Sequence, residues 1–106
     1  MNPHRILFDM QKSTKQPNWD DLRFFLEVVR AGTASAAAKR LGVDYTTVAR
    51  RIRALEEAMS ALLFDKSRSS GFTLTPDGQQ LVSHAEAMEG AMQAACEQVS
   101  GSGSAL

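Results

Sequence analysis

Cysteine, long apolar runs and an excess of one charge are all scarce in this 106-residue sequence. The one cysteine, Cys96, excludes an intrachain disulfide framework and fits a reducing compartment. No apolar run approaches the roughly 18 residues of a membrane-spanning helix, and we expect no signal peptide because the start of the chain lacks an apolar core. Twelve basic and twelve acidic residues give zero net charge, which excludes an acid-rich disordered chain and by itself argues against a nucleic-acid binder.

The sequence also lacks the patterns of a catalytic or metal-binding site. His4 and His84 are far apart, and Cys96 has no histidine near it in sequence. A glycine-rich phosphate loop and a spaced set of metal ligands are missing as well. We therefore expect neither an enzyme nor a metal site.

The zero net charge hides an uneven distribution along the chain. Residues 33–75 carry seven basic and four acidic side chains, whereas residues 76–106 carry four acidic side chains and no basic one. Such asymmetry between segments points to nucleic-acid binding or to a division of labour. The middle of the chain is the place to look for contacts with an anionic partner.

The first helix signal follows a short N-terminal arm. Residues 1–17 mix charged residues with proline and serine, and we predict a flexible arm. Asn18 offers an N-cap to a helix over residues 19–30, and Gly32 ends it. Apolar residues recur at helical spacing in this segment, so the helix should present an apolar stripe to a core.

Two further helix signals are separated by one tight turn. Ser35 offers an N-cap to a short helix that ends near Leu41, and Asp44 offers one to a helix over residues 45–58. Gly42 supplies a turn position that tolerates a positive φ. The two helices are predicted to form a helix–turn–helix, in which the second helix projects outward.

The second helix of this pair has an apolar and a polar face. Val48, Ile52 and Leu55 share the inner face. The outward face offers hydrogen-bond donors to the base edges and phosphates of a major groove, namely Thr46, Arg50 and Arg53, with Thr47 beside them. Arg51 lies to the side, where it would contact phosphate or form an ion pair. The alternative for the arginines is an ordinary solvated surface.

A hairpin and a long helix complete the predicted fold. The strands cover residues 62–65 and 72–75, and their apolar side chains should pack on the helices: Leu62, Phe64, Phe72 and Leu74. Lys66 and Arg68 lie in this wing, where they could reach phosphates or the adjacent minor groove. Residues 18–75 are therefore predicted to form a mainly α winged helix–turn–helix with three helices and a two-stranded β wing.

The long helix is predicted over residues 76–99, with Thr75 as its N-cap and Pro76 at its first position. Six residues on it follow heptad spacing: Leu81, Ala85, Met88, Met92, Ala95 and Val99. About 24 helical residues span roughly 36 Å, more than so small a domain can cover. We therefore expect dimerisation through this helix, with packing on its own domain as the alternative. Residues 100–106 have the composition of a flexible linker.

Four segments in this order resemble the LysR-type transcriptional regulators: residues 32–43 (GTASAAAKRLGV), 48–56 (VARRIRALE), 63–66 (LFDK) and 74–78 (LTPDG). The resemblance covers about residues 18–99. It implies a DNA-binding winged helix–turn–helix, a linker helix that dimerises, and a separate C-terminal domain that binds a small-molecule effector. Residues 100–106 would be the hinge toward that domain, which this sequence lacks, and no cofactor is expected in this fragment.

The resemblance also implies a role for individual residues. Base readers would be Tyr45, Thr46, Ala49 and Arg50, and phosphate contacts would come from Thr33, Ser35, Lys66 and Arg68. The family often has Ser-Gln-Pro where this chain has Asp44-Tyr45-Thr46, and it usually has glycine at the position of Ser60. These departures concern the target sequence more than the fold.

The expected partner is double-stranded DNA with an interrupted, roughly palindromic site, bound by a homodimer. The resemblance further implies a tetramer for the full-length regulator and a cytoplasmic location, without a membrane. The alternative is a winged-helix protein-interaction module without DNA specificity, which would use the same face against an acidic partner.

Overall fold

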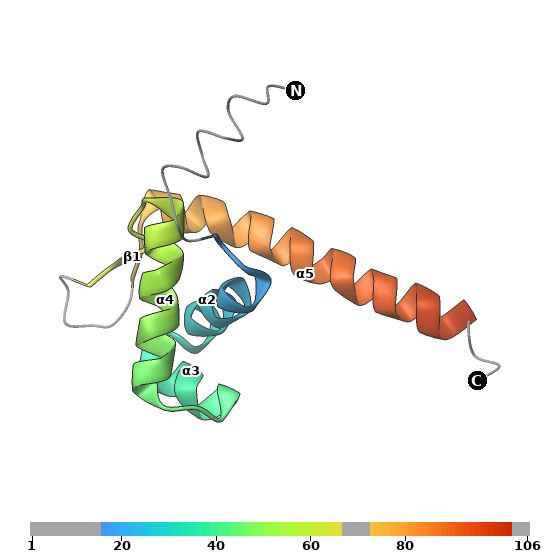
Figure 1. The fold of residues 1–106 in the computed structure, drawn as a ribbon, viewed down its shortest axis with the longest axis horizontal. Helices are drawn as coiled ribbons and strands as arrows, with labels where there is room; N and C mark the ends of the chain where they lie inside the picture. Colours follow the sequence, from blue (N-terminus) through green and yellow to red (C-terminus); the bar gives the residue numbers. More distant parts are fainter. Residues whose placement is uncertain (1–15, 67–72, 103–106) are drawn as a thin grey trace, which may run out of the picture.

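The computed structural model describes residues 16–66 and 73–102 (Figure 1). Its elements, labelled as in Figure 1, are α2 (Trp19–Ala31), α3 (Ala34–Leu41), α4 (Tyr45–Met59), β1 (Phe64–Asp65), β2 (Thr73–Leu74) and α5 (Pro76–Ser102). Helices α2, α3 and α4 pack against one another, and α5 begins beside them and extends away as a single long helix. This is the predicted winged helix–turn–helix followed by a long helix.

The core lies where α2, α4 and the wing meet. The side chains of Val48, Ile52 and Leu55 are all buried, as their spacing on α4 predicted. Phe25 of α2 is fully buried, and its ring centroid lies 5.4 Å from that of Phe64 in β1. Two such short strands would be only marginally stable alone. This aromatic contact packs the wing against the helices and so stabilises it.

The first N-cap is as predicted, and the second is not. The Asn18 side chain accepts a hydrogen bond from the Asp21 N–H at 2.8 Å. Helix α3, however, is capped by Thr33, whose hydroxyl accepts from the Ala36 N–H at 3.1 Å. The prediction that Ser35 caps α3 was wrong, because the extended backbone that an N-cap needs occurs two residues earlier.

The two ends of α4 have unusual features. Asp44 occupies the predicted N-cap position, but in the described structure its carboxylate accepts no capping hydrogen bond from the helix. At the other end Ser60 adopts a left-handed conformation, with φ 55°. Glycine adopts this conformation without steric cost, which explains physically why a glycine suits this position.

Among the described residues the strands of the wing are shorter than predicted, because residues 62, 63 and 75 lie outside them. Strands β1 and β2 pair antiparallel, with Phe64 opposite Leu74 and Asp65 opposite Thr73. The prediction that Leu62 packs on the helices was wrong, because its side chain is 68% exposed and the buried Leu63 takes the core position. Phe72 and Arg68 lie outside the described residues.

Helix α5 starts as predicted and ends later. The Thr75 hydroxyl accepts a hydrogen bond from the Gly78 N–H at 3.0 Å, and Pro76 is the first helical residue. The helix continues to Ser102, so residues 100–102, predicted to be linker, are helical. Linker composition lowers helix propensity, but it does not end a helix that is already propagating. Residues 103–106 lie outside the described chain, as do residues 1–15 of the predicted arm.

Gly78 is needed for the close approach of α5 to the wing. A Cβ at this position would collide with the Leu63 backbone oxygen and lie 2.9 Å from Leu74 Cδ2. Because backbone cannot move aside cheaply, we expect Gly78→Ala to lower the free energy of unfolding by about 1–3 kcal/mol. Gly90 is the matched control, since a Cβ there meets no described atom within 4 Å. Gly90→Ala should raise stability by up to about 1 kcal/mol in urea unfolding. Equal effects of the two substitutions would contradict the packing argument.

Candidate nucleic-acid interface

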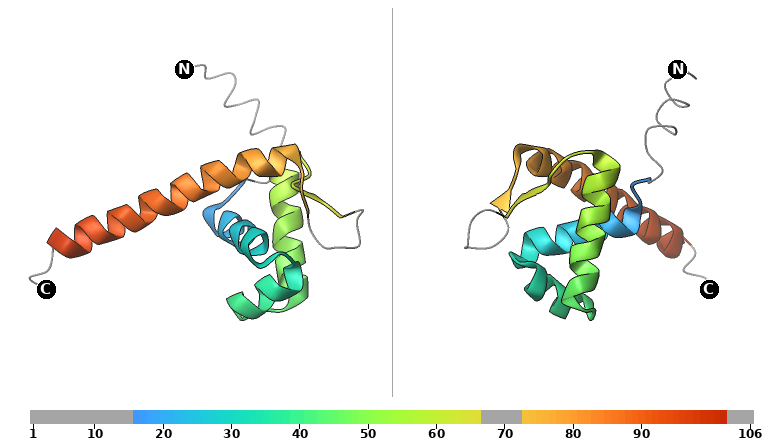
Figure 2. Two further views of the ribbon diagram at one scale, coloured as in Figure 1. Left: turned by 180° about the vertical axis from the view of Figure 1, so that it is seen from behind. Right: turned by 60° about the vertical axis from the view of Figure 1, so that its left-hand side comes forward.

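The outward face of α4 carries the side chains predicted to read bases. Tyr45 is 52% exposed, and Thr46 and Arg50 are exposed as well. Thr47 and Ala49 are half-buried at the edges of this face. In the right-hand view of Figure 2, α4 lies in front of α2 with the wing beside it. The first turns of α4 are therefore open to an external partner.

Arg50 and Arg53 on this face have no hydrogen-bond or ion-pair partner among the described residues. The other arginines of the helices differ: Arg23, Arg30 and Arg51 each bind a carboxylate within 3.0 Å, and Arg40 lies 3.8 Å from the Glu27 carboxylate. A guanidinium has five N–H donors, which can bind a phosphate or the acceptor edge of guanine. Uncompensated positive charge is thus available on the outward face of α4.

The start of α3 offers the two hydroxyls that were predicted to contact phosphate. Thr33 and Ser35 are both exposed. The Thr33 oxygen accepts a hydrogen bond from the helix, which leaves the hydroxyl hydrogen able to donate outward. This geometry fits a phosphate contact at the N-terminus of α3.

Arg51 forms an ion pair, the second of its two predicted roles. Its Nη1 lies 2.7 Å from Asp20 Oδ2 and 3.0 Å from Asp21 Oδ1. The hydrogen bond to Asp21 raises the pKa of Arg51 above its usual value. The guanidinium also lies over the Phe24 ring, 4.7 Å from its centroid. These contacts tie α4 to α2, so Arg51 positions the helix that carries the candidate contacts.

Loss of this ion pair should destabilise the domain. Arg51→Met leaves the nearly buried Asp21 carboxylate without its cation, and we expect the free energy of unfolding to fall by about 1–3 kcal/mol. Arg50→Met makes the same chemical change one position earlier, where the described structure provides no partner. Its effect should stay within about 0.5 kcal/mol. Urea unfolding compares the two variants, and equal losses would contradict the assigned role of Arg51.

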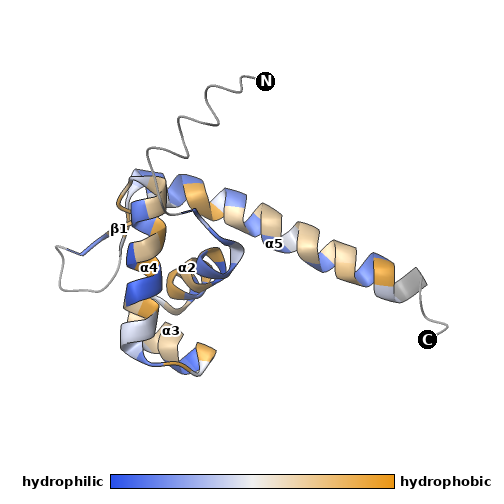
Figure 3. Cartoon of the chain, in the orientation of Figure 1, coloured by the Kyte–Doolittle hydropathy of each residue, from blue (hydrophilic) through white to orange (hydrophobic). Residues whose placement is uncertain are grey.

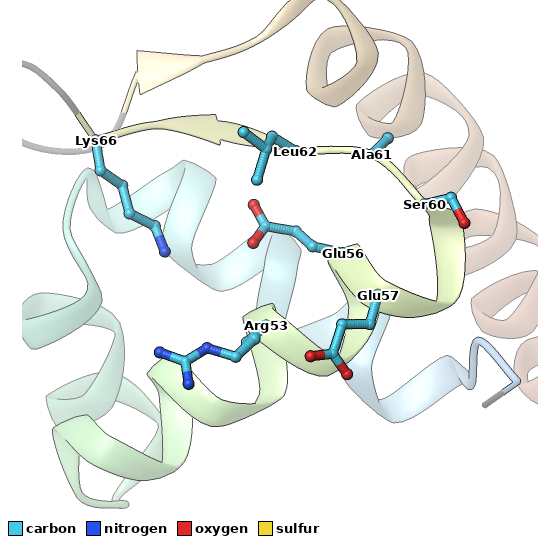
Figure 4. A pocket seen from close by; sticks show the side chains of 7 residues that line it. All are labelled: Arg53, Glu56, Glu57, Ser60, Ala61, Leu62 and Lys66. Carbon is cyan, nitrogen blue, oxygen red and sulfur yellow. The ribbon is translucent and has the colours of Figure 1, made fainter. Parts of the chain in front are cut away.

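An open hollow of about 510 Å³ separates the C-terminal half of α4 from the wing (Figure 4). Arg53 extends into it from α4 and Lys66 from the end of β1. Glu56 is 8% exposed, and its carboxylate accepts a hydrogen bond from the Leu63 N–H at 2.9 Å. Glu56 thereby fixes the turn from α4 into the wing. This role could not be predicted, because nothing in the local sequence distinguishes a glutamate that binds a backbone N–H from a solvated one.

The six residues predicted to form a dimer seam divide into two groups along α5. Ala85 is fully buried in the core of its own domain, and Leu81 packs against the same core. The prediction that Ala85 contacts a second copy was therefore wrong, because α5 lies against α2 in this part of the helix. The remaining four, Met88, Met92, Ala95 and Val99, are exposed. Figure 3 shows hydrophobic positions recurring along α5 as it extends away from the other helices.

Residues 16–66 and 73–102 show no sign of two other kinds of site. Within these ranges no helix combines the length and apolarity needed to cross a membrane. The same ranges contain no cluster of three or more His, Cys, Asp or Glu side chains able to hold a metal ion. The candidate functional site is thus the surface formed by α4 and the start of the wing.

The tight turn between α3 and α4, the exposed α4 and the two-stranded wing define a winged helix–turn–helix domain. The model of the family described as "Bacterial regulatory helix-turn-helix protein, lysR family" matches residues 19–79. The chain belongs to this family.

Similar curated proteins are transcriptional regulators by their names. The chain is 34% identical over 85 residues to the HTH-type transcriptional regulator TdcA of Escherichia coli (strain K12), covering 80% of this chain and 27% of that protein. It is 47% identical over 47 residues to the Mau operon transcriptional activator of Paracoccus denitrificans, covering 44% of this chain and 17% of that protein. The chain thus spans only a minor part of the length of these relatives.

Solved structures show the same architecture. The structure described as VV2_1132, a LysR family transcriptional regulator, has a TM-score of 0.70 and 34% identity, over 76% of this chain and 28% of that one. The CbnR_DBD–DNA complex has a TM-score of 0.74 and 27% identity, over 81% of this chain and 98% of that one. The alignment to CbnR_DBD thus covers nearly all of a chain that was crystallised with DNA.

Proposed function

We propose that this chain is the sequence-specific, double-stranded-DNA-binding domain of a LysR-family transcriptional regulator. The observation that carries the proposal is the outward face of α4, where exposed Tyr45 and Thr46 accompany two arginines that lack partners among the described residues. Helix α4 enters the major groove and reads base edges through Tyr45, Thr46, Ala49 and Arg50.

Phosphate contacts supply much of the affinity in this proposal. They come from Thr33 and Ser35 at the start of α3, from Arg53 of α4 and from Lys66 after β1. Arg68, the other predicted phosphate contact, lies outside the described residues. Arg51 is left out, because its ion pair with α2 occupies it. Neutralising phosphates releases counterions, so the affinity for every duplex should fall as salt is raised.

In this proposal two copies of the chain form a homodimer through the exposed apolar stripe of α5. Met88, Met92, Ala95 and Val99 are exposed and continue the heptad spacing along α5 after the buried Ala85. Residues 76–106 carry acidic and no basic side chains, which keeps this element away from phosphates. Two copies related by a two-fold axis would bind an interrupted, roughly palindromic site.

The proposal divides the chain into a DNA-binding unit over residues 18–75 and a linker helix from residue 76. The full-length regulator would add an effector-binding domain that takes a small molecule, and would assemble as a tetramer. It would act in the bacterial cytoplasm, where its DNA lies, and it would not be an enzyme.

A gel-retardation experiment tests DNA binding against the alternative of a protein-interaction module. The chain is mixed with random-sequence duplex at low salt, and the titration is repeated at increasing salt. We expect retardation at low salt that weakens steadily as salt increases. A protein that retards no duplex at low salt would contradict the proposal and favour the module that binds an acidic protein partner.

A further inference from the structure

Helix α2 lies between α4 and α5 and forms an ion pair with each. Near its N-terminus Asp20 and Asp21 bind Arg51 of α4. In its last turn Arg30 binds Glu89 of α5, with Nη1–Oε2 and Nη2–Oε1 distances of 3.1 and 2.8 Å. The orientation of α5 relative to α4 is therefore transmitted through α2.

Glu89 lies at the end of the part of α5 that contacts its own domain, and α5 as a whole extends away from the other helices (Figures 1 and 2). Before it, Ala85 is fully buried, and Leu81 and Val82 pack against the core. After it, every side chain from residue 90 to residue 100 is exposed. The pair between Arg30 and Glu89 thus holds α5 at the edge of its contact with the domain.

The geometry of this pair suits it to fix an orientation. Two parallel N–H···O bonds between one guanidinium and one carboxylate define a direction as well as a distance. The hydrogen bond from Arg30 holds the pKa of the Glu89 carboxyl below its usual value. Both side chains are more than a third exposed, at 39% and 38%, so the pair adds little to the stability of the fold. Its structural effect is to oppose tilting of α5.

A small tilt of α5 would move a dimer partner by a distance that matters on DNA. The helix continues for about 20 Å beyond Glu89, at 1.5 Å per residue. A tilt of about 10° at Glu89 would displace the far end by about 3.4 Å, roughly one base-pair step. The exposed apolar residues proposed to bind the second copy lie mostly on this part of α5, so they would move with it.

We propose that Arg30 and Glu89 are positioning residues that set the separation of the two half-sites accepted by the dimer. The inference rests on the proposed function, because it assumes that two copies paired through α5 bind one duplex. With the pair intact, each recognition helix is held at a fixed angle to the dimer axis, and one separation is preferred. Without it, α5 samples a range of tilts and neighbouring separations become acceptable.

Three single variants of this chain test the proposal. Glu89→Gln and Arg30→Gln each remove the pair but change the net charge in opposite directions. Glu86→Gln is the matched control, since Glu86 lies one turn earlier on α5, raises the pKa of Arg30 only through its charge, and has no hydrogen bond among the described residues. Thermal unfolding of each variant verifies that it is folded before DNA is added.

The measured quantity is how the affinity for DNA depends on the separation of the two half-sites. Wild type selects its preferred sites from a random duplex library, and Kd values are then measured for duplexes whose separation is preferred, one base pair shorter or one base pair longer. We expect both Glu89→Gln and Arg30→Gln to reduce the preference for the best separation by about two- to fivefold. Glu86→Gln should keep the wild-type preference.

The outcomes distinguish an effect of the pair on the orientation of α5 from an effect of the changed net charge on DNA affinity. Loss of preference in both pair variants, with opposite changes in overall affinity, would support the proposal. An unchanged preference in both, or an equal loss in Glu86→Gln, would overturn it. A wild-type selection that yields no common sequence would instead contradict the proposed function, on which the inference depends.

Discussion

Replacing Arg50 by alanine is expected to weaken binding to the preferred duplex by about 1–3 kcal/mol, or roughly five- to 150-fold, and to relax base preference at one position in each half-site. The side chain is exposed on α4 and has no hydrogen-bond or ion-pair partner among the described residues. A guanidinium in this position can donate two hydrogen bonds to the two acceptors on the major-groove edge of guanine. No other base presents the same pair of acceptors there. Kd values for the preferred duplex and its single-base variants give both quantities.

Arg23→Ala is the control for this experiment, because it removes the same charge from α2, where Arg23 pairs with Asp20 at 2.9 Å. It should weaken binding to all duplexes slightly and to a similar degree, leaving the base preference intact. If Arg50→Ala bound every duplex as tightly as wild type, Arg50 would not be a base reader.

Placing glutamate at both Met88 and Met92 is expected to give a monomer and to reduce affinity for the full site by about 100-fold or more. Both side chains are about half-exposed, at 47% and 54%, on the part of α5 that lies beyond the core. Two carboxylates in a paired apolar seam would be buried without cations, which is strongly unfavourable. A monomer loses the second half-site, and linked binding of two sites commonly contributes about 10²–10⁴ in affinity. Sedimentation gives the oligomeric state, and titration of a two-half-site duplex gives the affinity.

The matched control puts the same two charges on the other side of α5. Gln93 and Ala94 are exposed, and at about 100° per residue they point away from the stripe that contains Met88 and Met92. Gln93→Glu with Ala94→Glu should remain dimeric. Persistent dimers after the Met88 and Met92 substitutions would remove the basis for the seam on α5.

The helices were predictable because periodicity and capping act locally. Val48, Ile52 and Leu55 are buried at the spacing that predicted an inner face, and Asn18 and Thr75 cap the helices that they were expected to cap. Where two candidates lay close together, local chemistry could not choose between them. Thr33 rather than Ser35 caps α3, and Leu63 rather than Leu62 enters the core, because tertiary packing sets the backbone there.

The candidate site was predictable on α4 and less so elsewhere. The outward face of α4 follows from one helix and its turn, so Tyr45 and Arg50 are found exposed as expected. The heptad spacing of α5 is continuous through Ala85, and nothing in that spacing indicates where the helix stops contacting its own domain. Arg30 and Glu89 are 59 positions apart in sequence, so their ion pair could be recognised only from the packing of α2 on α5.

The arginines of this chain have different partners, so its zero net charge hides a local excess of positive charge. Arg51 and Arg30 are bound to carboxylates and hold the helices together. Arg50 and Arg53 lack such partners among the described residues and face outward from α4. A nucleic-acid surface therefore depends on which cations remain uncompensated at one place, and the total charge of the chain does not report it.

The ratio of affinities for a selected and a scrambled duplex tests the central proposal most directly. The preferred sequence is obtained by selection from random duplex DNA, and Kd values for it and for a scrambled sequence of equal length are measured at physiological salt. Sequence-specific recognition by α4 predicts a preference of about 10³-fold or more, with both affinities falling as salt increases. Equal affinities for the two duplexes would contradict it, because phosphate contacts alone would then account for the binding.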